Sequence, residues 1–177
     1  GTAITYWDDG QATAAVRLEN DTRQTLPAGT ISMFSGGGFS GEARLPRMKP
    51  GEAQFVFFGL ELDVEVDQRV IEQQRELVRV EVNGDQSGGV FHFVQRGKHE
   101  VTTHNRAGHA KKVVVALDLP RNAKLSGASE IDWDESRQQV LIGVPTPASS
   151  TAVQTYSAET NHREAFNWQS LNDEQLL

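Results

Sequence analysis

The chain has 177 residues, of which 37% are hydrophobic and 23% charged, as in ordinary folded globular proteins. Its formal net charge of −7 argues against nucleic-acid binding, which needs clustered Lys and Arg side chains. The absence of cysteine excludes disulfide frameworks, cysteine-based zinc sites and thiol nucleophiles. No apolar run approaches the roughly 18 residues that a membrane-spanning helix needs. We therefore expect a soluble module with no transmembrane segment.

The N-terminal third of the chain shows the period-two alternation of half-buried strands. In Ala12–Leu18, alternate residues are apolar and share one face. Turns at Asn20–Thr22 and Leu26–Gly29 separate this segment from a second strand, Thr30–Phe34. The glycines that follow predict a hairpin to Phe39–Leu45.

The middle of the chain predicts a long central hairpin. After a dense apolar strand at Phe55–Leu60, valines of one parity run through Val64–Val82. Within that stretch Gln68–Leu77 also fits a helical face, because it is rich in Gln, Glu and Arg. The β-branched residues at both ends favour a strand. A loop at Asn83–Gly89 then leads to a long partner strand, Val90–Asn105.

The C-terminal part continues the same pattern, with strands expected at Ala110–Leu119, Glu130–Asp134, Gln139–Val144 and Thr151–Tyr156. Short strands between frequent turns predict an all-β protein, an antiparallel β-sandwich that is immunoglobulin-like or larger. We assign residues 1–157 to this module, with a division into two small sandwiches near residues 64–66 left open.

Residues 158–177 form a tail of different character. Asn172–Gln175 has the pattern of a capping box that opens a helix just before the last residue. We therefore expect a short C-terminal helix start and interpret the chain as a truncated piece of a larger protein.

Several segments, taken together and in order, resemble one known family. They are Leu26–Phe34, Gly38–Pro46, Pro50–Glu52, Phe58–Asp63, Val101–Asn105 and Val113–Pro120. This set resembles the C-terminal conserved domain, of unknown function, of the bacterial mucoidy-inhibitor-A-like proteins over roughly residues 12–157. The glycine-rich turn Gly36–Gly38 and the sparsely basic stretch Gln68–Val82 depart from the family pattern.

The resemblance implies an antiparallel β domain that follows a β region and long coiled-coil helices in intact relatives. It also implies a periplasmic or cell-envelope setting and a loose link to exopolysaccharide phenotype. It supplies no active-site residues and no cofactor.

Four of the five histidines, His92, His99, His104 and His109, cluster in the sequence and raise the hypothesis of a zinc or copper site. Metal ligands must converge on one ion at about 2 Å. His99 and His104 have opposite parity on the expected strand, so they should point to opposite faces. We favour histidines that line strands or the surface, with a metal-binding module as an alternative.

Asp132, Asp134 and Ser136 resemble the first half of a calcium loop, but the required glycine and distal glutamate are missing. We expect outward-facing acids on either side of an inward-facing Trp133.

Gly36–Gly38 lacks the Lys and Ser/Thr that follow the glycines of a phosphate-binding loop. No Gly-x-Ser-x-Gly motif is present either.

These observations favour a non-catalytic interaction or scaffold module of a larger, envelope-associated protein, and we predict no catalytic residues. The expected partners are the rest of its own polypeptide or a second copy through sheet edges. An alternative is recognition or processing of a polysaccharide, which an exposed Trp in a groove would favour. Trp7 and Trp168 are candidate ligand contacts because they lie near the ends of the sequence.

Overall fold

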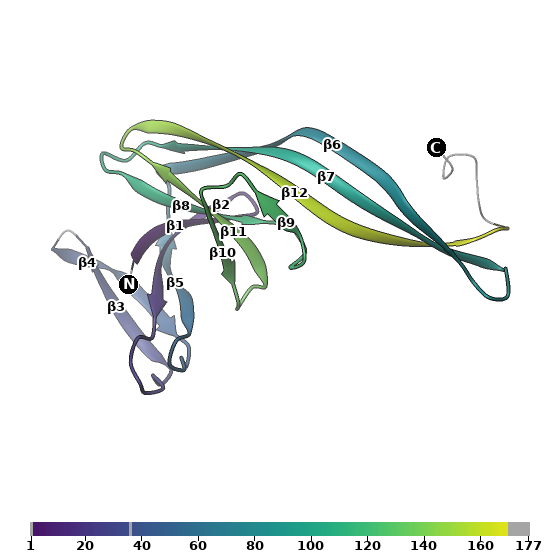
Figure 1. Ribbon diagram of the computed structural model, residues 1–177. Helices are drawn as coiled ribbons and strands as arrows, with labels where there is room; N and C mark the ends of the chain where they lie inside the picture. The colour runs from purple at the N-terminus through teal and green to yellow at the C-terminus, as the bar shows by residue number, and fades with distance from the viewer. Residues whose placement is uncertain (1, 36, 170–177) are drawn as a thin grey trace. The chain divides into compact units, whose positions relative to one another are not determined.

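The computed structural model describes residues 2–35 and 37–169, in which every regular element is a β-strand (Figure 1). In chain order the strands are β1 (Thr2–Asp8), β2 (Gln11–Glu19), β3 (Gly29–Ser35), β4 (Gly38–Leu45), β5 (Ala53–Leu60), β6 (Val64–Val82), β7 (Gly88–Asn105), β8 (Lys111–Leu117), β9 (Lys124–Ser126), β10 (Glu130–Asp134), β11 (Gln139–Thr146) and β12 (Ser150–Asn167). No helix in this part of the chain is long and apolar enough to cross a membrane.

The predicted all-β class and the β-sandwich are confirmed, and the ambiguous stretch Val64–Val82 is one continuous strand. The long central hairpin is confirmed as β6 and β7. The last predicted strand is longer than expected, since β12 continues to Asn167 through much of the expected tail. Strands β1 and β9 were not predicted. The expected helix start at Asn172–Gln175 lies outside the described residues.

The chain divides into two compact units, each assembled from three separate stretches of sequence. The first unit contains residues 1–68, 101–121 and 128–154. The second contains residues 69–100, 122–127 and 155–177. Because β6, β7 and β12 each contribute to both units, the boundary does not fall in a single linker near residues 64–66.

The first unit is built on a six-stranded sheet in the order β10-β11-β8-β1-β2-β5. Neighbouring strands are antiparallel except for β1 and β8, which pair in parallel from Thr5↔Val113 to Trp7↔Val115. Strands β3 and β4 form a separate antiparallel hairpin.

One face of the six-stranded sheet carries the sandwich core of the first unit. Its central strands place Val113, Val115 and Ile142 in fully buried positions. In β7, Val101 and Thr103 are also fully buried, and the Thr103 hydroxyl lies 2.7 Å from that of Thr146 in β11. Removing such β-branched side chains from water stabilises the packed sheets by about 1.5–3 kcal/mol per side chain.

The second unit contains a four-stranded sheet in the order β6-β7-β12-β9 (Figure 1). This sheet is poorly buried at its β6 edge, where every residue from Asp67 to Val80 is exposed. Buried side chains come from β7 and β12, including Phe91, Tyr156 and Phe166.

Asn105 at the end of β7 generates a test of the first unit. This buried side chain donates through Nδ2 to the carbonyl oxygens of His109 and Pro147, each at 2.9 Å, and accepts from the Ala107 N–H at 3.0 Å. We expect Asn105→Ala to lower the free energy of unfolding by about 1–3 kcal/mol, because buried backbone groups lose their partners. Urea titration followed by tryptophan fluorescence measures this change.

The matched control is Asn161→Ala, at an exposed position in β12. That change should alter the free energy of unfolding by less than about 0.5 kcal/mol. Equal effects of the two substitutions would contradict the assigned role of Asn105.

Candidate functional site

The six-stranded sheet is strongly curved. The face opposite its sandwich core lies on the concave side and is called the inner face below. Arg17 in β2 donates from Nε to Asp132 Oδ2 in β10 at 3.0 Å. Three strands, β1, β8 and β11, lie between β2 and β10 in the sheet. In a flat sheet, strands four places apart are about 19 Å from each other. Two side chains can join such strands only because the sheet curves toward this face.

The two edges of the same sheet also meet. The turn after β10 places Ser136 Oγ 2.6 Å from Gln54 Oε1 in β5, the opposite edge strand. In the same turn the Arg137 guanidinium lies 4.1 Å from the centre of the Phe57 ring of β5. The inner face is therefore closed off near this turn.

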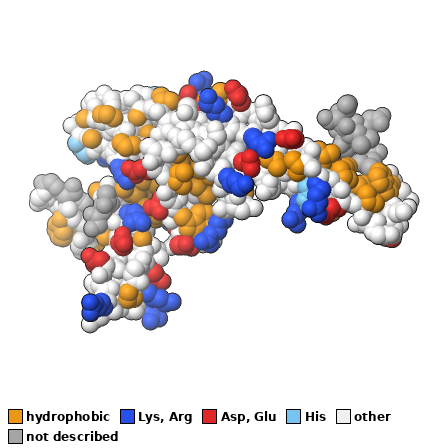
Figure 2. Space-filling model, in the orientation of Figure 1, with side chains coloured by type: hydrophobic (Ala, Val, Ile, Leu, Met, Phe, Trp, Pro, Cys, Tyr) orange, Lys and Arg blue, Asp and Glu red, His pale blue; other side chains and the backbone are white. Residues whose placement is uncertain are grey.

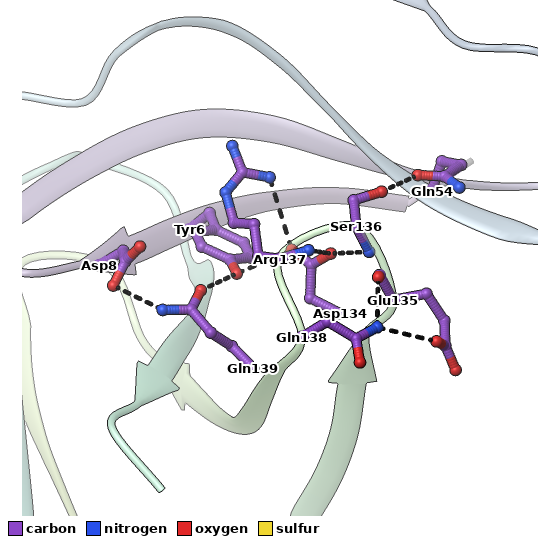
Figure 3. Close-up of polar contacts among 9 residues, drawn as sticks. All are labelled: Tyr6, Asp8, Gln54, Asp134, Glu135, Ser136, Arg137, Gln138 and Gln139. Carbon is purple, nitrogen blue, oxygen red and sulfur yellow. Dashed lines mark hydrogen bonds and ion pairs between the residues drawn. The ribbon is translucent and has the colours of Figure 1, made fainter. Parts of the chain in front are cut away.

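A buried polar network fills the closed end (Figure 3). The Tyr6 hydroxyl donates to Asp134 Oδ2 at 2.9 Å, and Asp134 is only 2% exposed. Asp134 Oδ1 accepts the backbone N–H groups of Ser136 and Arg137, and the Arg137 guanidinium lies 3.5 Å from Oδ2. Burial and the Asp134 carboxylate raise the pKa of Tyr6 well above its ordinary range, so this hydroxyl stays protonated as a donor.

This network corrects the expectation that Asp134 faces outward. The strand alternation is regular, but the curled sheet brings the Tyr6 hydroxyl to the face that Asp134 occupies. Trp133, expected inside, is half-buried, with the Arg121 guanidinium 4.9 Å from its ring centre. The three residues of the calcium hypothesis do not share a centre, since Asp132 contacts Arg17, Asp134 contacts Tyr6, and Ser136 contacts Gln54.

The other end of the curled sheet is open and forms a cavity of about 550 Å³. All six strands contribute side chains to it, namely Ile4, Arg17, Phe55, Val114, Asp132 and Leu141. Ile4, Val114 and Leu141 are buried and make its apolar floor. Its rim carries the Arg17–Asp132 pair and a second ion pair between Lys112 and Glu130.

A different kind of surface occurs in the second unit, on strand β6. This strand is at the edge of its sheet and is hydrogen-bonded only to β7 among the described strands. It exposes a series of large apolar side chains, Val70, Ile71, Leu77, Val78, Val80 and Val82. Figure 2 shows hydrophobic side chains along the part of the molecule where Figure 1 labels β6 and β7, among charged ones.

The arginines of β6 are engaged by acids of the same chain. Arg69 donates to Glu100 at 2.7 Å, Arg75 pairs with Glu164, and Arg79 pairs with Glu81. On the neighbouring strand Arg96 joins Glu76 and Glu159, each at 2.9 Å. Besides these ion pairs, the edge offers its exposed apolar side chains, its backbone groups and the exposed polar side chains of Gln68 and 72–74.

Aromatic side chains of β7 and β12 pack together within the second unit. Phe91 stacks on Phe166, with ring centres 4.3 Å apart, and Trp168 meets Phe166 edge-on at 5.0 Å. Trp168, a candidate ligand contact, remains 52% exposed. Trp7, the other candidate, is half-buried in β1 of the first unit. No tryptophan lines the cavity of the curled sheet, whose aromatic wall is Phe55.

The four candidate histidines each have their own environment. His92 Nε2 lies 3.2 Å from Glu81, and the ring of His99 stacks on Tyr156 with centres 4.9 Å apart. Burial is the main cause that lowers the pKa of both His92 and His99. His104 contacts Thr151 and Asp67, whereas the His109 carbonyl accepts from Asn105. Within residues 2–35 and 37–169, no group of three or more His, Cys, Asp or Glu side chains could hold a metal ion.

Sequence reasoning singled out Asp132 and Asp134 but did not find the partners that they meet on the curled face. Arg17 and Asp132 are 115 positions apart, so no local motif joins them. The alternation in Ala12–Leu18 did place Arg17 on the opposite face from Val16. The sequence indicated strand β6 more clearly, because the valines of this strand share one parity along its whole length.

Comparison of the chain with protein-family models, curated proteins and solved structures finds no match.

The two tyrosines of the chain, Tyr6 in the buried network and Tyr156 in β12, provide a pH test of their burial. Burial raises the pKa of Tyr6 and of Tyr156 in the folded protein. The unfolded chain therefore loses these protons first, and stability that is complete below about pH 10 should fall as the pH rises further. Urea unfolding at a series of alkaline pH values measures the fall, and absorbance reports tyrosinate directly.

Tyr6→Phe is the comparison variant, and its stability should decline less steeply with alkaline pH than that of the wild type. Appearance of tyrosinate at the same pH in the native and urea-unfolded protein would contradict the burial of both hydroxyls.

Proposed function

We propose that this chain is a non-catalytic interaction module and that the edge of β6 binds an extended, apolar segment of another polypeptide. The observation that carries the proposal is an edge strand 19 residues long that exposes apolar side chains at residues 70–71 and again between Leu77 and Val82. Edge strands present unpaired backbone N–H and C=O groups, which template the addition of a further strand.

The chemistry of the partner follows from the charges around β6. Native edges are commonly protected by free charges that repel an incoming strand. Here Arg69, Arg75 and Arg79 already have acidic partners in their own chain, which weakens their attraction for an acidic peptide. A strand rich in β-branched residues with few charges fits such an edge best, because it pairs backbone with backbone and buries apolar area.

The state of the ionisable groups supports binding rather than catalysis. Asp134 is occupied by Tyr6, two backbone N–H groups and Arg137. The raised pKa of Tyr6 disfavours its use as a base. Both side chains are held by these contacts inside the closed end of the sheet.

We also propose kinship with the mucoidy-inhibitor-A-like proteins, and with it a cell-envelope setting. What supports this is the order of the quoted segments along the chain. They fall in succession on β3, β4, the connection before β5, the end of β5, the end of β7 and β8. The partner would then be a segment of another protein of the envelope.

Selection of peptides from a random library displayed on phage tests the strand-binding proposal. We expect the wild-type protein to enrich peptides that alternate apolar β-branched residues with polar ones. The double variant Val78→Lys and Val80→Lys should bind the selected peptides at least about tenfold more weakly, because docking would bury the added charges. Fluorescence anisotropy with labelled peptides measures the affinities.

Val153→Lys is the matched control, since Val153 is an equally exposed strand residue of the first unit, at 58% against 53% for Val78. It should bind the peptides like the wild type, and circular dichroism should show the same strand content in all variants. Failure to enrich alternating peptides, or equal binding to the double variant, would exclude β6 as the docking edge. Self-association that the double variant abolishes would instead identify a second copy as the occupant and overturn the assignment to a different protein.

A further inference from the structure

The open end of the curled six-stranded sheet has the construction of a ligand site that is independent of β6. Its cavity of about 550 Å³ falls within the range of small-molecule sites, which often occupy the mouths of curled or closed sheets. Side chains from all six strands converge on it, so the backbone of the whole sheet fixes its shape. The Tyr6–Asp134 network closes the opposite end.

The charged side chains that line the cavity are two basic and two acidic, and Glu19, outside the lining, lies 3.4 Å from Arg17. Arg17 is paired with Asp132 at 3.0 Å, and Lys112 is paired with Glu130. A charged ligand would compete with one partner of a pair and leave the other uncompensated. A neutral ligand leaves both pairs intact, so the electrostatics favour a neutral molecule.

The same rim offers hydrogen-bond donors and acceptors side by side. Arg17 and Lys112 can only donate, whereas the ionised carboxylates of Asp132 and Glu130 can only accept. A hydroxyl group donates and accepts at once, so it can bridge the two members of an ion pair. The four side chains remain 35–48% exposed, which leaves them accessible from solvent.

The floor of the cavity is apolar and held in place by packing. Ile4, Val114 and Leu141 form it, and Phe55 stands at its side. Gly143 makes room for the rim, because a Cβ there would lie 2.7 Å from Glu130 Oε2. The carbon face of a bound molecule would contact this floor while its hydroxyl groups meet the rim.

We propose that this cavity binds a small neutral molecule that carries several hydroxyl groups on a compact carbon skeleton, either a sugar ring or an acyclic polyol. This ligand site rests on the cavity in the first unit and does not depend on strand binding by β6.

Titration of the protein with methyl glucoside and with sorbitol, followed by methyl resonances in NMR spectra, tests the proposal. The methyl signals of Ile4, Val114 and Leu141 should shift saturably, whereas those of Val113 and Val115, on the opposite face of the sheet, should not. Binding of the glucoside alone identifies a ring as the ligand, and binding of both identifies hydroxylated chains in general. No saturable shift with either probe, or equal shifts at Val113 and Val115, would overturn the proposal.

Two charge variants separate a ligand site from ion pairs that only hold the sheet together. Asp132→Asn leaves a net positive rim and should improve binding of glucuronate relative to methyl glucoside by about fivefold. Arg17→Gln leaves a net negative rim and should favour protonated glucosamine by a similar factor. Ion pairs with a purely structural role would change stability without this reciprocal selectivity, and its absence in folded variants would overturn the proposal.

Arg121→Gln is the control for net charge, because Arg121 pairs with Glu135 on the surface of the same unit, away from the cavity lining. It should leave all four affinities unchanged. An equal change of selectivity in Arg121→Gln would assign the effect to overall charge and overturn the proposal.

Discussion

The meeting of the two edges of the six-stranded sheet is the constraint on which the first unit depends. Ser136 and Arg137, in the turn after β10, contact Gln54 and Phe57 of β5 at the other edge. That closure makes an interior from a face that would otherwise be open to water. Tyr6 and Asp134 are buried there with hydrogen-bond partners that they and the turn after β10 supply, without which burial would be costly.

Because the sheet curls, both of its faces are buried, and different kinds of side chain pack on each face. The sandwich face is filled with Val113, Val115 and Ile142. The inner face combines small and large side chains, so that Ala15 is fully buried beside Tyr6. This inner packing fills one end of the curl and leaves the cavity at the other. The second unit uses ion pairs and an aromatic cluster on a sheet whose edge strand stays exposed.

Local patterns predicted the fold class well and the inner face poorly. The valines of β6 share one parity, and this outweighed the Gln-rich and Glu-rich stretch that also fits a helix. Strand β1 was missed because Ile4, Thr5 and Tyr6 are all buried, which removes the alternation of a half-buried strand. Strand β9 is only three residues long. Asp134 and Arg17 have partners more than a hundred positions away, and period-two patterns carry no information about such pairs.

The central claim is that the sheet edges meet, and nuclear Overhauser effects between Arg137 and Phe57 test it most directly. With the guanidinium 4.1 Å from the ring centre, we predict cross-peaks between the Arg137 side chain and the Phe57 ring protons, and upfield-shifted Arg137 signals. In a flat six-stranded sheet the edges would be about 24 Å apart. Absence of these cross-peaks in the folded protein would contradict the curled sheet, its buried network and its cavity.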